Sequence, residues 1–283
     1  MPHHPIGVFD SGIGGLSVLQ ALRAALPLEH FVYLDDSAYA PYGERDEAHV
    51  MDRSRAITHY LRYQHGGGHG IKALVIACNT ATMAAVALLR AEHPDLPIVG
   101  VEPGLKPAAA ASRTKRVGVI GTRGTVTSAK FNALRRSLQD QAEFVVQPCD
   151  GLADAISRSV KTQDDSKIIA LCADYTSVMG QFGLNPGEID TLVLGCTNYV
   201  FAQAHLATLV GPQVRILSTG EPVARRTRHL LETAGTLATQ GPGRVQLVTT
   251  GDPAVLQAAA RRWLGFATED AVHWAAEHGP LNP

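Results

Sequence analysis

Short, uninterrupted apolar runs alternate with longer stretches of helical pattern along nearly the whole chain. Strands that are apolar at every position are buried on both faces, and such strands belong to parallel sheets covered by helices on both sides. The sequence therefore predicts an α/β protein with mainly parallel sheets flanked by helices. The runs are IGVFD, HFVYLDD, KALVIA, PIVGV, RVGVIG, EFVVQPC, TLVLGC, VRILST and RVQLVTT.

The second half of the chain repeats features of the first. IGVFDSGIGGLSV at residue 6 aligns with VGVIGTRGTVTS at residue 117, an offset of 111, and LVIAC at 74 aligns with LVLGC at 192, an offset of 118. Any two parallel strands can look alike, but both of these matches continue beyond the strand. We therefore predict a duplicated α/β unit.

Two of the four cysteines, Cys78 and Cys196, end equivalent strands of this repeat. Ligands of open parallel sheets lie at the carboxyl ends of the strands, and a helix that starts there favours a thiolate. Two thiols on opposite faces of one carbon could remove and deliver a proton and so invert a stereocentre without a cofactor. Polar residues that could stabilise the carbanion are Ser11, Asn79, Thr80, Thr197 and Asn198.

A single cysteine at a strand end is more often a small buried hydrophobic residue than a catalyst. The repetition, with a polar pair after each cysteine, favours catalysis for Cys78 and Cys196. Cys149 and Cys172 have no such pair, and we expect them in the core. Asp10, at the end of the first strand, could cap a helix or assist catalysis. The following SGIGG turn is no dinucleotide fingerprint, because Ser17 stands where the third glycine belongs.

Composition narrows the class of protein. The formal net charge of −1 provides no basic surface for nucleic acid, and the apolar runs are too short to span a membrane. The amino-terminal residues lack the pattern of a secretory signal. The cysteines are widely spaced without a C-x-x-C motif, which argues against a disulfide framework or a metal site. We therefore expect a soluble cytoplasmic protein that binds a small molecule.

Several motifs together resemble the glutamate racemases, cofactor-independent enzymes that supply D-glutamate for peptidoglycan. The similarity runs from Ile6 to about Gly265. It implies two pseudosymmetric α/β domains with the active site in the cleft between them, and no cofactor. The motifs are FDSGIGGLSVL, YLDDSAYAPYGER, LVIACNTAT, VGVEPG, GTRGTVTS, LVLGCT and TTGDP.

The resemblance also implies roles for individual residues. Cys78 would be the base for the D-enantiomer and Cys196 the base for the L-enantiomer, with Asp10 assisting Cys78. A homodimer is compatible with the resemblance, since dimers are common in that family. The residues implied to bind the amino acid are Asp10, Ser11, Tyr42, Gly43, Asn79, Thr80, Thr197 and Asn198, with Thr125 as a weaker candidate.

The family pattern further suggests where the chain passes between the domains. Residues 1–101 with 215–283 would form the first domain, and residues 102–214 the second. VRILST and RVQLVTT would then complete the first sheet. The tail after Gly265 lies beyond the resemblance, and Val272, Trp274 and Ala275 could form one face of a short helix that packs on the body or on a partner.

Two departures from the family pattern concern the second cysteine. The usual G-C-T-H-Y-P reads GCTNYV here, so Asn198 replaces the histidine that assists the cysteine. A glutamate often found eight residues after a cysteine placed like Cys149 is replaced by Ser157, although Asp154 could approach the same space. Asparagine cannot transfer a proton near neutral pH. We therefore expect slow racemisation at pH 7, an alkaline optimum and higher activity for Asn198→His.

Two alternative functions follow from the same residues. The site could have diverged to racemise aspartate or another acidic amino acid. Because Asn198 replaces the histidine, the chain could also be a weakly active or inactive ligand-binding relative. Exchange of the α-hydrogen with solvent deuterium distinguishes these alternatives from glutamate racemisation.

Overall fold

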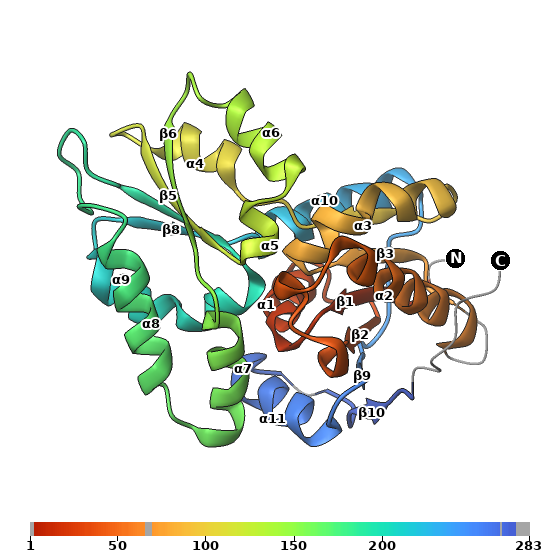
Figure 1. Ribbon diagram of the computed structural model, residues 1–283. Helices are drawn as coiled ribbons and strands as arrows, with labels where there is room; N and C mark the ends of the chain where they lie inside the picture. The colour runs from red at the N-terminus through yellow and green to blue at the C-terminus, as the bar shows by residue number, and fades with distance from the viewer. Residues whose placement is uncertain (1–2, 66–69, 267, 276–283) are drawn as a thin grey trace. The chain divides into compact units, whose positions relative to one another are not determined.

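The computed structural model describes residues 3–65, 70–266 and 268–275. Its residues form two compact units, Met1–Val101 with Gly220–Pro283, and Glu102–Thr219. Each unit is built around one sheet, and every strand pairing in the described residues is parallel. The predicted class, mainly parallel sheets flanked by helices, is confirmed in both units (Figure 1).

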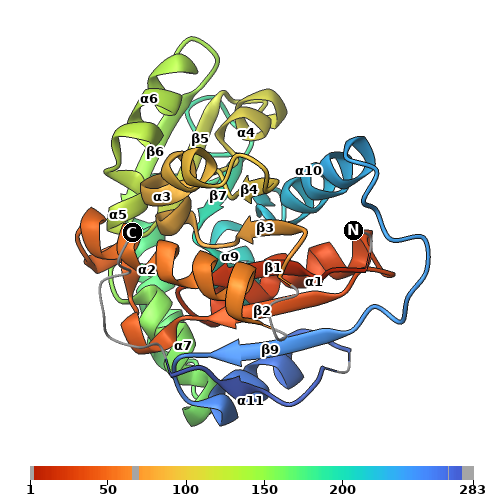
Figure 2. The same ribbon diagram turned by 90° about the vertical axis from the view of Figure 1, so that its right-hand side faces the viewer.

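The first unit contains a six-stranded sheet in the order β10-β9-β2-β1-β3-β4. Figure 2 shows β3, β1, β2 and β9 running side by side in this order. The strand residues of β1, β2 and β3 are buried throughout, as expected for a sheet covered on both faces. The strands are β1 (Ile6–Asp10), β2 (Phe31–Asp35), β3 (Ala73–Ile76), β4 (Ile98–Gly100), β9 (Val245–Thr249) and β10 (Val272–His273).

Two groups of helices cover this sheet. Helix α1 packs against α10 and α11, while α2 packs against α3. Beneath α2 and α3, alternate strand residues such as Phe9, Leu34 and Ile76 form a continuous apolar core. The helices are α1 (Leu16–Ala25), α2 (Glu47–His59), α3 (Asn79–Glu92), α10 (Gly220–Thr233) and α11 (Pro253–Trp263), with short turns η1 (Ile13–Gly15), η2 (Ser37–Tyr39), η3 (Tyr42–Glu44) and the π-helical η4 (Tyr60–Gln64).

The second unit contains a four-stranded sheet in the order β6-β5-β7-β8. Figure 1 shows α4, α5 and α6 on one side of it and α7, α8 and α9 on the other. Its elements are β5 (Arg116–Gly121), β6 (Glu143–Pro148), β7 (Thr191–Gly195), β8 (Arg215–Leu217), α4 (Leu105–Ala111), α5 (Arg123–Val126), α6 (Ala129–Ser137), α7 (Leu152–Thr162), α8 (Ser166–Ser177), η6 (Thr197–Ala202) and α9 (Gln203–Val210).

The two sheets share a strand order, since β2-β1-β3-β4 in the first unit corresponds to β6-β5-β7-β8 in the second. This is the arrangement that a duplicated unit would produce. The strand VRILST was expected to complete the first sheet, and this expectation is wrong because β8 pairs with β7 in the second unit. The offset of 118 residues that relates Leu74 to Leu192 also relates Ile98 to Ile216, so β8 is the counterpart of β4.

The tail after Gly265 also differs from its predicted conformation. Val272 and His273 form the short strand β10 beside β9, and Trp274 continues this strand by donating its backbone N–H to the carbonyl of Thr249 at 2.7 Å. The predicted helix is therefore wrong. Val272 and Trp274 are two residues apart, which is the spacing of one strand face.

Candidate active site

Polar side chains of the first unit gather where β1 and β3 end. Ser11 donates its backbone N–H and its hydroxyl to Oδ1 of Asp10, at 2.6 and 3.2 Å. The Sγ atom of Cys78 lies 3.7 Å from Oγ of Ser11, within hydrogen-bonding distance for sulfur. The Oδ1 atom of Asp10 is thus bonded to the residue that contacts the cysteine. Asp10, Ser11 and Cys78 thus form a connected chain.

A glycine allows this chain to pack closely. A Cβ atom at Gly15 would lie 2.7 Å from Cβ of Asp10 and 2.8 Å from the hydroxyl of Tyr33. Any larger residue would therefore displace Asp10, which is itself 1% exposed. Gly15 in the SGIGG turn therefore permits the close packing of Asp10 and Tyr33.

Cys78 is the N-cap residue of α3. Its sulfur accepts the backbone N–H of Ala81 at 3.4 Å, and it is 5% exposed. An N–H donor and the positive end of a 14-residue helix both stabilise negative charge on sulfur. Asn79 and Thr80 form the first turn of the same helix and are buried beside the sulfur. This environment suits a thiol that must act as a base.

The turn after β2 places Tyr42 and Gly43 in η3. Tyr42 is buried in the same apolar core as Cys78, and its hydroxyl donates to Asp36 at 2.5 Å. Burial and then the charge of Asp36 hold the pKa of Tyr42 well above its usual range. Tyr42 therefore stays a protonated donor committed to Asp36.

A second carboxylate lies next to Asp10 in the sheet. Asp35 ends β2 in register with Asp10 at the end of β1. Burial, together with the charges of Asp10 and Asp36, raises the pKa of Asp35 to about 6 against the hydrogen bonds from Ser37 and Thr249. Its Oδ1 atom is buried without a hydrogen-bond partner among the described residues. The predicted residue set lacked Asp35 and its neighbour Asp36, although the adjacent acids in YLDD mark the end of a strand.

In the second unit, Cys196 follows β7 and is 7% exposed. It was expected to precede a helix as Cys78 does, and this expectation needs correction, because the segment after it is the 3-10 turn η6 and its sulfur makes no capping bond. The Nδ2 atom of Asn198 lies 4.0 Å from the sulfur, the limit for a hydrogen bond. The two thiols therefore occupy unequal environments.

The other residues predicted in this unit lie around the ends of β5 and β7. Thr197 begins η6 and is buried, as is Thr125, whose hydroxyl accepts that of Thr122 at 3.0 Å. Gly121 and Gly195 pair at the ends of β5 and β7, which brings the two segments together. The structure thus groups Thr125 with Cys196, Thr197 and Asn198 at one edge of the second sheet.

Ser157 and Asp154, the two candidates for the place of the family's glutamate, both make hydrogen bonds within α7. Ser157 donates its hydroxyl to the carbonyl of Ala153 within α7. Asp154 accepts Nε of Arg158 at 3.0 Å on the same helix, so its carboxylate is engaged on the surface.

The remaining cysteines are buried, as predicted. Burial raises the pKa of Cys172 to about 11, and burial, followed by Cys172 and Cys196, raises that of Cys149. Both stay thiols at neutral pH, and none of the four cysteines is in a disulfide. Cys78 and Cys196 are therefore the better candidates for proton transfer.

Each strand-end cysteine is accompanied by an asparagine with unsatisfied polar atoms. Asn79 is 3% exposed and neither atom of its amide has a partner among the described residues, while Asn198 is 7% exposed and its Oδ1 is also unpaired. A buried polar group without a partner costs about 1–3 kcal/mol. A ligand with both donors and acceptors would remove this cost, and a zwitterionic amino acid has both.

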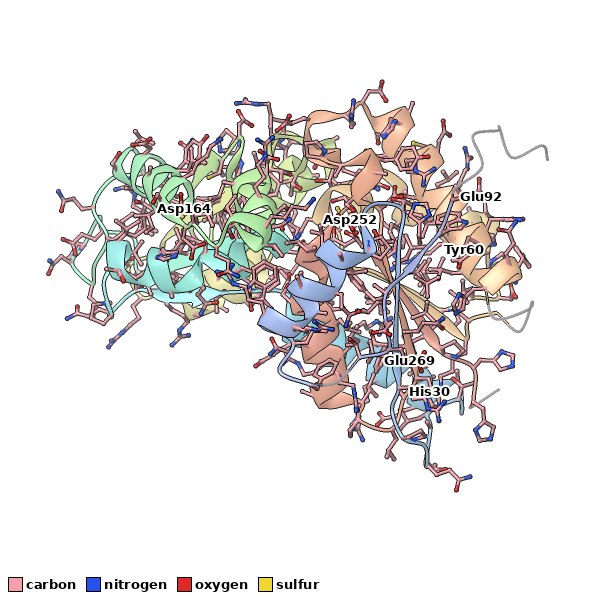
Figure 3. The ribbon with its side chains drawn as sticks, turned by 90° about the horizontal axis from the view of Figure 1, so that it is seen from below. His30, Tyr60, Glu92, Asp164, Asp252 and Glu269 are labelled. Atoms are coloured by element: carbon pink, nitrogen blue, oxygen red, sulfur yellow. The ribbon has the colours of Figure 1, made fainter. Side chains whose placement is uncertain are left out.

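A separate hollow of about 310 Å³ lies at the opposite ends of the first unit's strands, where His30 and Arg244 precede β2 and β9. Figure 3 labels His30 and Glu269, which help to line it. The predicted site residues lie at the carboxyl ends of the strands instead.

Within residues 3–65, 70–266 and 268–275, no cluster of three or more His, Cys, Asp or Glu side chains is arranged to hold a metal ion. In the same part of the chain, no helix has the length and apolar character needed to cross a membrane.

The parallel α/β fold and the strand-end thiols point to the racemases. Residues 6–227 match the family described as Asp/Glu/Hydantoin racemase, and the chain belongs to this family. The glutamate racemase of Ectopseudomonas mendocina (strain ymp) is 43% identical to it over 264 residues, which cover 92% of this chain and 95% of that protein.

Solved structures agree with this assignment. Glutamate racemase isoform RacE1 from Bacillus anthracis has a TM-score of 0.83 at 29% identity and covers 97% of this chain and 98% of its own. The glutamate racemase from Thermus thermophilus, solved with β-chloro-D-alanine, has a TM-score of 0.76 at 34% identity and covers 96% and 97%. The resemblance found in the sequence is confirmed, and the chain is an isomerase of the racemase class.

Proposed function

We propose that this protein interconverts L-glutamate and D-glutamate without a cofactor and thereby supplies D-glutamate for peptidoglycan. Membership of the Asp/Glu/Hydantoin racemase family and the similarity to relatives named glutamate racemases support this substrate. The observation that carries the proposal is a buried asparagine with at least one unpaired amide atom beside each of the two strand-end cysteines, Asn79 beside Cys78 and Asn198 beside Cys196.

In the proposed reaction the two thiols act on opposite faces of the α-carbon. With D-glutamate, the Cys78 thiolate takes the α-hydrogen as a proton, and the electron pair of the broken C–H bond remains on the substrate as a carbanion. The Cys196 thiol then gives its proton to the other face and becomes the thiolate. With L-glutamate the roles reverse, so Cys196 is the base and Cys78 the acid. No atom is gained or lost in either direction.

The carbanion is stabilised by moving charge into the neighbouring carboxylate. Donors already placed at that carboxylate would lower the barrier, because they need not reorganise during the reaction. In this proposal Asn79 and Thr80 from α3, and Thr197 and Asn198 from η6, supply such donors. Asp10 would assist Cys78 through Ser11, while the Tyr42–Gly43 turn would contact the rest of the amino acid.

Solvent-deuterium exchange at the α-carbon tests this function. The wild type in D₂O should incorporate deuterium into glutamate of either configuration. Cys78→Ala should lower the rate of inversion by about 10²–10⁴-fold, the usual contribution of an acid or base. Cys172→Ala is the matched control, because that thiol is buried in α8 and its pKa is raised to about 11. Inversion at the wild-type rate in Cys78→Ala would exclude the two-thiol mechanism.

The same experiment separates the alternatives. Exchange with aspartate or another acidic amino acid, but not with glutamate, would assign a different substrate. The absence of exchange with every amino acid would indicate a ligand-binding relative. The weak contact between Cys196 and Asn198, which stands in place of the family's histidine, is the observation that favours this alternative. Because enantiomers have equal free energy, kcat/KM must be equal in the two directions for any active form.

A further inference from the structure

Asp36 is the centre of a buried hydrogen-bond network beside the Tyr42–Gly43 turn. Its carboxylate is 0% exposed and accepts Nε and Nη2 of Arg53, at 3.0 and 2.8 Å. It also accepts the hydroxyls of Tyr42 and Thr250, at 2.5 and 3.0 Å. A buried carboxylate with four donors fixes each of them, because moving one leaves a charge less well compensated. The position of Tyr42 therefore depends on Asp36.

Two aromatic rings lie against the guanidinium group of Arg53. The Cζ atom of Arg53 lies 3.5 Å from the ring centroid of Tyr39 and 5.9 Å from that of Trp274. Trp274 in turn stacks on Tyr60, which Figure 3 labels, with centroids 4.2 Å apart and 22° between the planes. A guanidinium within about 6 Å of an aromatic face is held by electrostatic attraction. Trp274 thus restricts the position of Arg53.

The carboxyl-terminal strand brings Trp274 to this position. The backbone N–H of Trp274 donates to the carbonyl of Thr249, and the next residue, Thr250, supplies one of the donors to Asp36. Strand β10 therefore places Trp274 beside the end of β9, next to the residue that donates to Asp36. A short edge strand far along the chain is connected in this way to the turn after β2.

We propose that Arg53 and Trp274 are positioning residues for the Tyr42–Gly43 turn, and that the carboxyl-terminal strand thereby sets the affinity of the site for an acidic amino acid. This inference rests on the proposed function, in which that turn contacts the substrate. Neither side chain takes part in proton transfer. Their loss should weaken substrate binding and leave the chemical step nearly unchanged.

Kinetics of paired variants distinguish positioning from simple packing. Trp274→Leu keeps apolar volume but removes the aromatic face, and it should raise KM for glutamate about three- to tenfold with kcat within about twofold. Trp274→Phe restores an aromatic face and should bring KM back toward the wild-type value. Trp263→Leu, at the end of α11, is the control and should leave KM unchanged. Equal KM values for Trp274→Leu and the wild type would overturn the proposal.

A double-mutant cycle tests whether the two residues act through one another. Arg53→Lys keeps the charge but loses the planar fork that bridges Asp36 and faces the rings. It should raise KM as Trp274→Leu does, and the double variant should show no further increase. Arg55→Lys on the same helix, where Arg55 pairs with Glu92 on the surface, is the control. Additive increases in KM would contradict the proposed connection.

Fluorescence provides a measurement that needs no activity. The chain contains two tryptophans, so Trp263→Phe leaves Trp274 as the only one. In that background Arg53→Lys should shift the emission of Trp274, and Arg55→Lys should not. An unchanged emission would overturn the positioning role even if the wild type did not racemise glutamate. Conversely, an active wild type with a Trp274→Leu variant of normal KM would refute the positioning role and leave the proposed function intact.

Discussion

The Sγ atom of Cys78 accepts the backbone N–H of Ala81 at 3.4 Å, in the first turn of a 14-residue helix. Cys196, at the equivalent strand end, precedes a 3-10 turn and makes no capping bond. A long helix whose first-turn N–H donates to the sulfur stabilises a thiolate, and a short 3-10 turn does so much less. The proposed acid/base pair is therefore asymmetric, and the Cys196 half should limit turnover.

The first prediction concerns Asn198, the polar residue beside the weaker thiol. Its Nδ2 atom is 4.0 Å from the sulfur, and the amide cannot act as a general acid or base near pH 7. Asn198→His introduces a group that can, and we expect kcat/KM at pH 7 to rise by about tenfold, with the acidic limb of the pH profile moving to lower pH. Steady-state rates between pH 6 and 10 measure both effects.

Val200→Pro, which restores the other family residue of this motif, is a suitable control for Asn198→His. It changes no titratable group, so its pH profile should follow that of the wild type. A wild-type profile already at its maximum at pH 7, together with no gain from the histidine, would show that asparagine is not the limiting feature.

Much of the fold was predictable because parallel strands are apolar at every position. The repeat predicted that Cys78 and Cys196 follow equivalent strands, as they follow β3 and β7. The error at β8 arose from the family pattern, although the offset relating Leu74 to Leu192 would have assigned Ile216 correctly. The sheet to which a strand is added depends on which sheet edge is still unpaired, and this depends on the three-dimensional arrangement of the strands.

The candidate site was less completely predictable. Asp10 and Ser11 could be predicted because they lie in the motif FDSGIGGLSVL, and Cys78 because it ends the repeated LVIAC. Asp36 and Arg53 could not, since their connection to Tyr42 depends on the three-dimensional packing of α2 against the turn after β2. Trp274 was missed for the same reason, because it lies more than 200 residues from the turn that its network supports.

The second prediction concerns Asp35, whose pKa burial raises to about 6. An acid with a raised pKa binds more protons in the folded than in the unfolded state, so stability falls as pH rises from about 4 to about 6. Above that window the full cost of up to about 3 kcal/mol is present. Asp35→Asn should remove this cost, and its gain over the wild type should grow between pH 4.5 and pH 7.5.

Urea unfolding of both proteins at these two pH values measures the change expected for Asp35→Asn. Asp46→Asn provides the comparison, since Asp46 is an exposed N-cap residue. A stability difference between Asp35→Asn and the wild type that is the same at both pH values would show that the Asp35 carboxyl does not titrate in this range.

The third prediction concerns Asp190, which joins the start of β7 to the loop before β5. It is 4% exposed and accepts the Ser112 hydroxyl at 2.7 Å and the backbone N–H groups of Arg113 and Thr114 at 2.6 and 3.0 Å. Burial opposes ionisation, but these bonds prevail and lower the pKa of Asp190. Its stabilisation should be full above about pH 4 and lost as pH falls further.

Asp190→Ala should therefore lower the free energy of unfolding of the second unit by about 1–3 kcal/mol at pH 7, because several donors lose their acceptor. The difference from the wild type should shrink in acid. Asp140→Ala, at an exposed position of the same unit, should have little effect. Thermal unfolding at pH 7 and pH 3 provides the measurement, and equal losses at both pH values would contradict this account.

The fourth prediction concerns the buried pair of Lys72 and Glu29 in the first unit. Their side chains are each 2% exposed, and Nζ lies 2.6 Å from Oε2 in an ion pair. Lys72 also donates to the carbonyl of Thr236 at 2.8 Å, and Glu29 accepts the N–H of Ala238 at 2.8 Å. The pair thus attaches the segment before β9 to the segments before β2 and β3.

Removing one partner leaves an uncompensated buried charge, so Lys72→Met should lower the free energy of unfolding by about 3–5 kcal/mol. Glu29→Gln in the Lys72→Met background removes that charge while keeping the acceptor for Ala238, and it should recover part of the loss. The exposed pair of Arg225 and Glu221 provides the control, and Arg225→Met should cost about 1 kcal/mol or less. Urea unfolding of the single and double variants decides the matter. If the double variant lost as much as the sum of both single variants, the two charges would not be coupled across the ion pair.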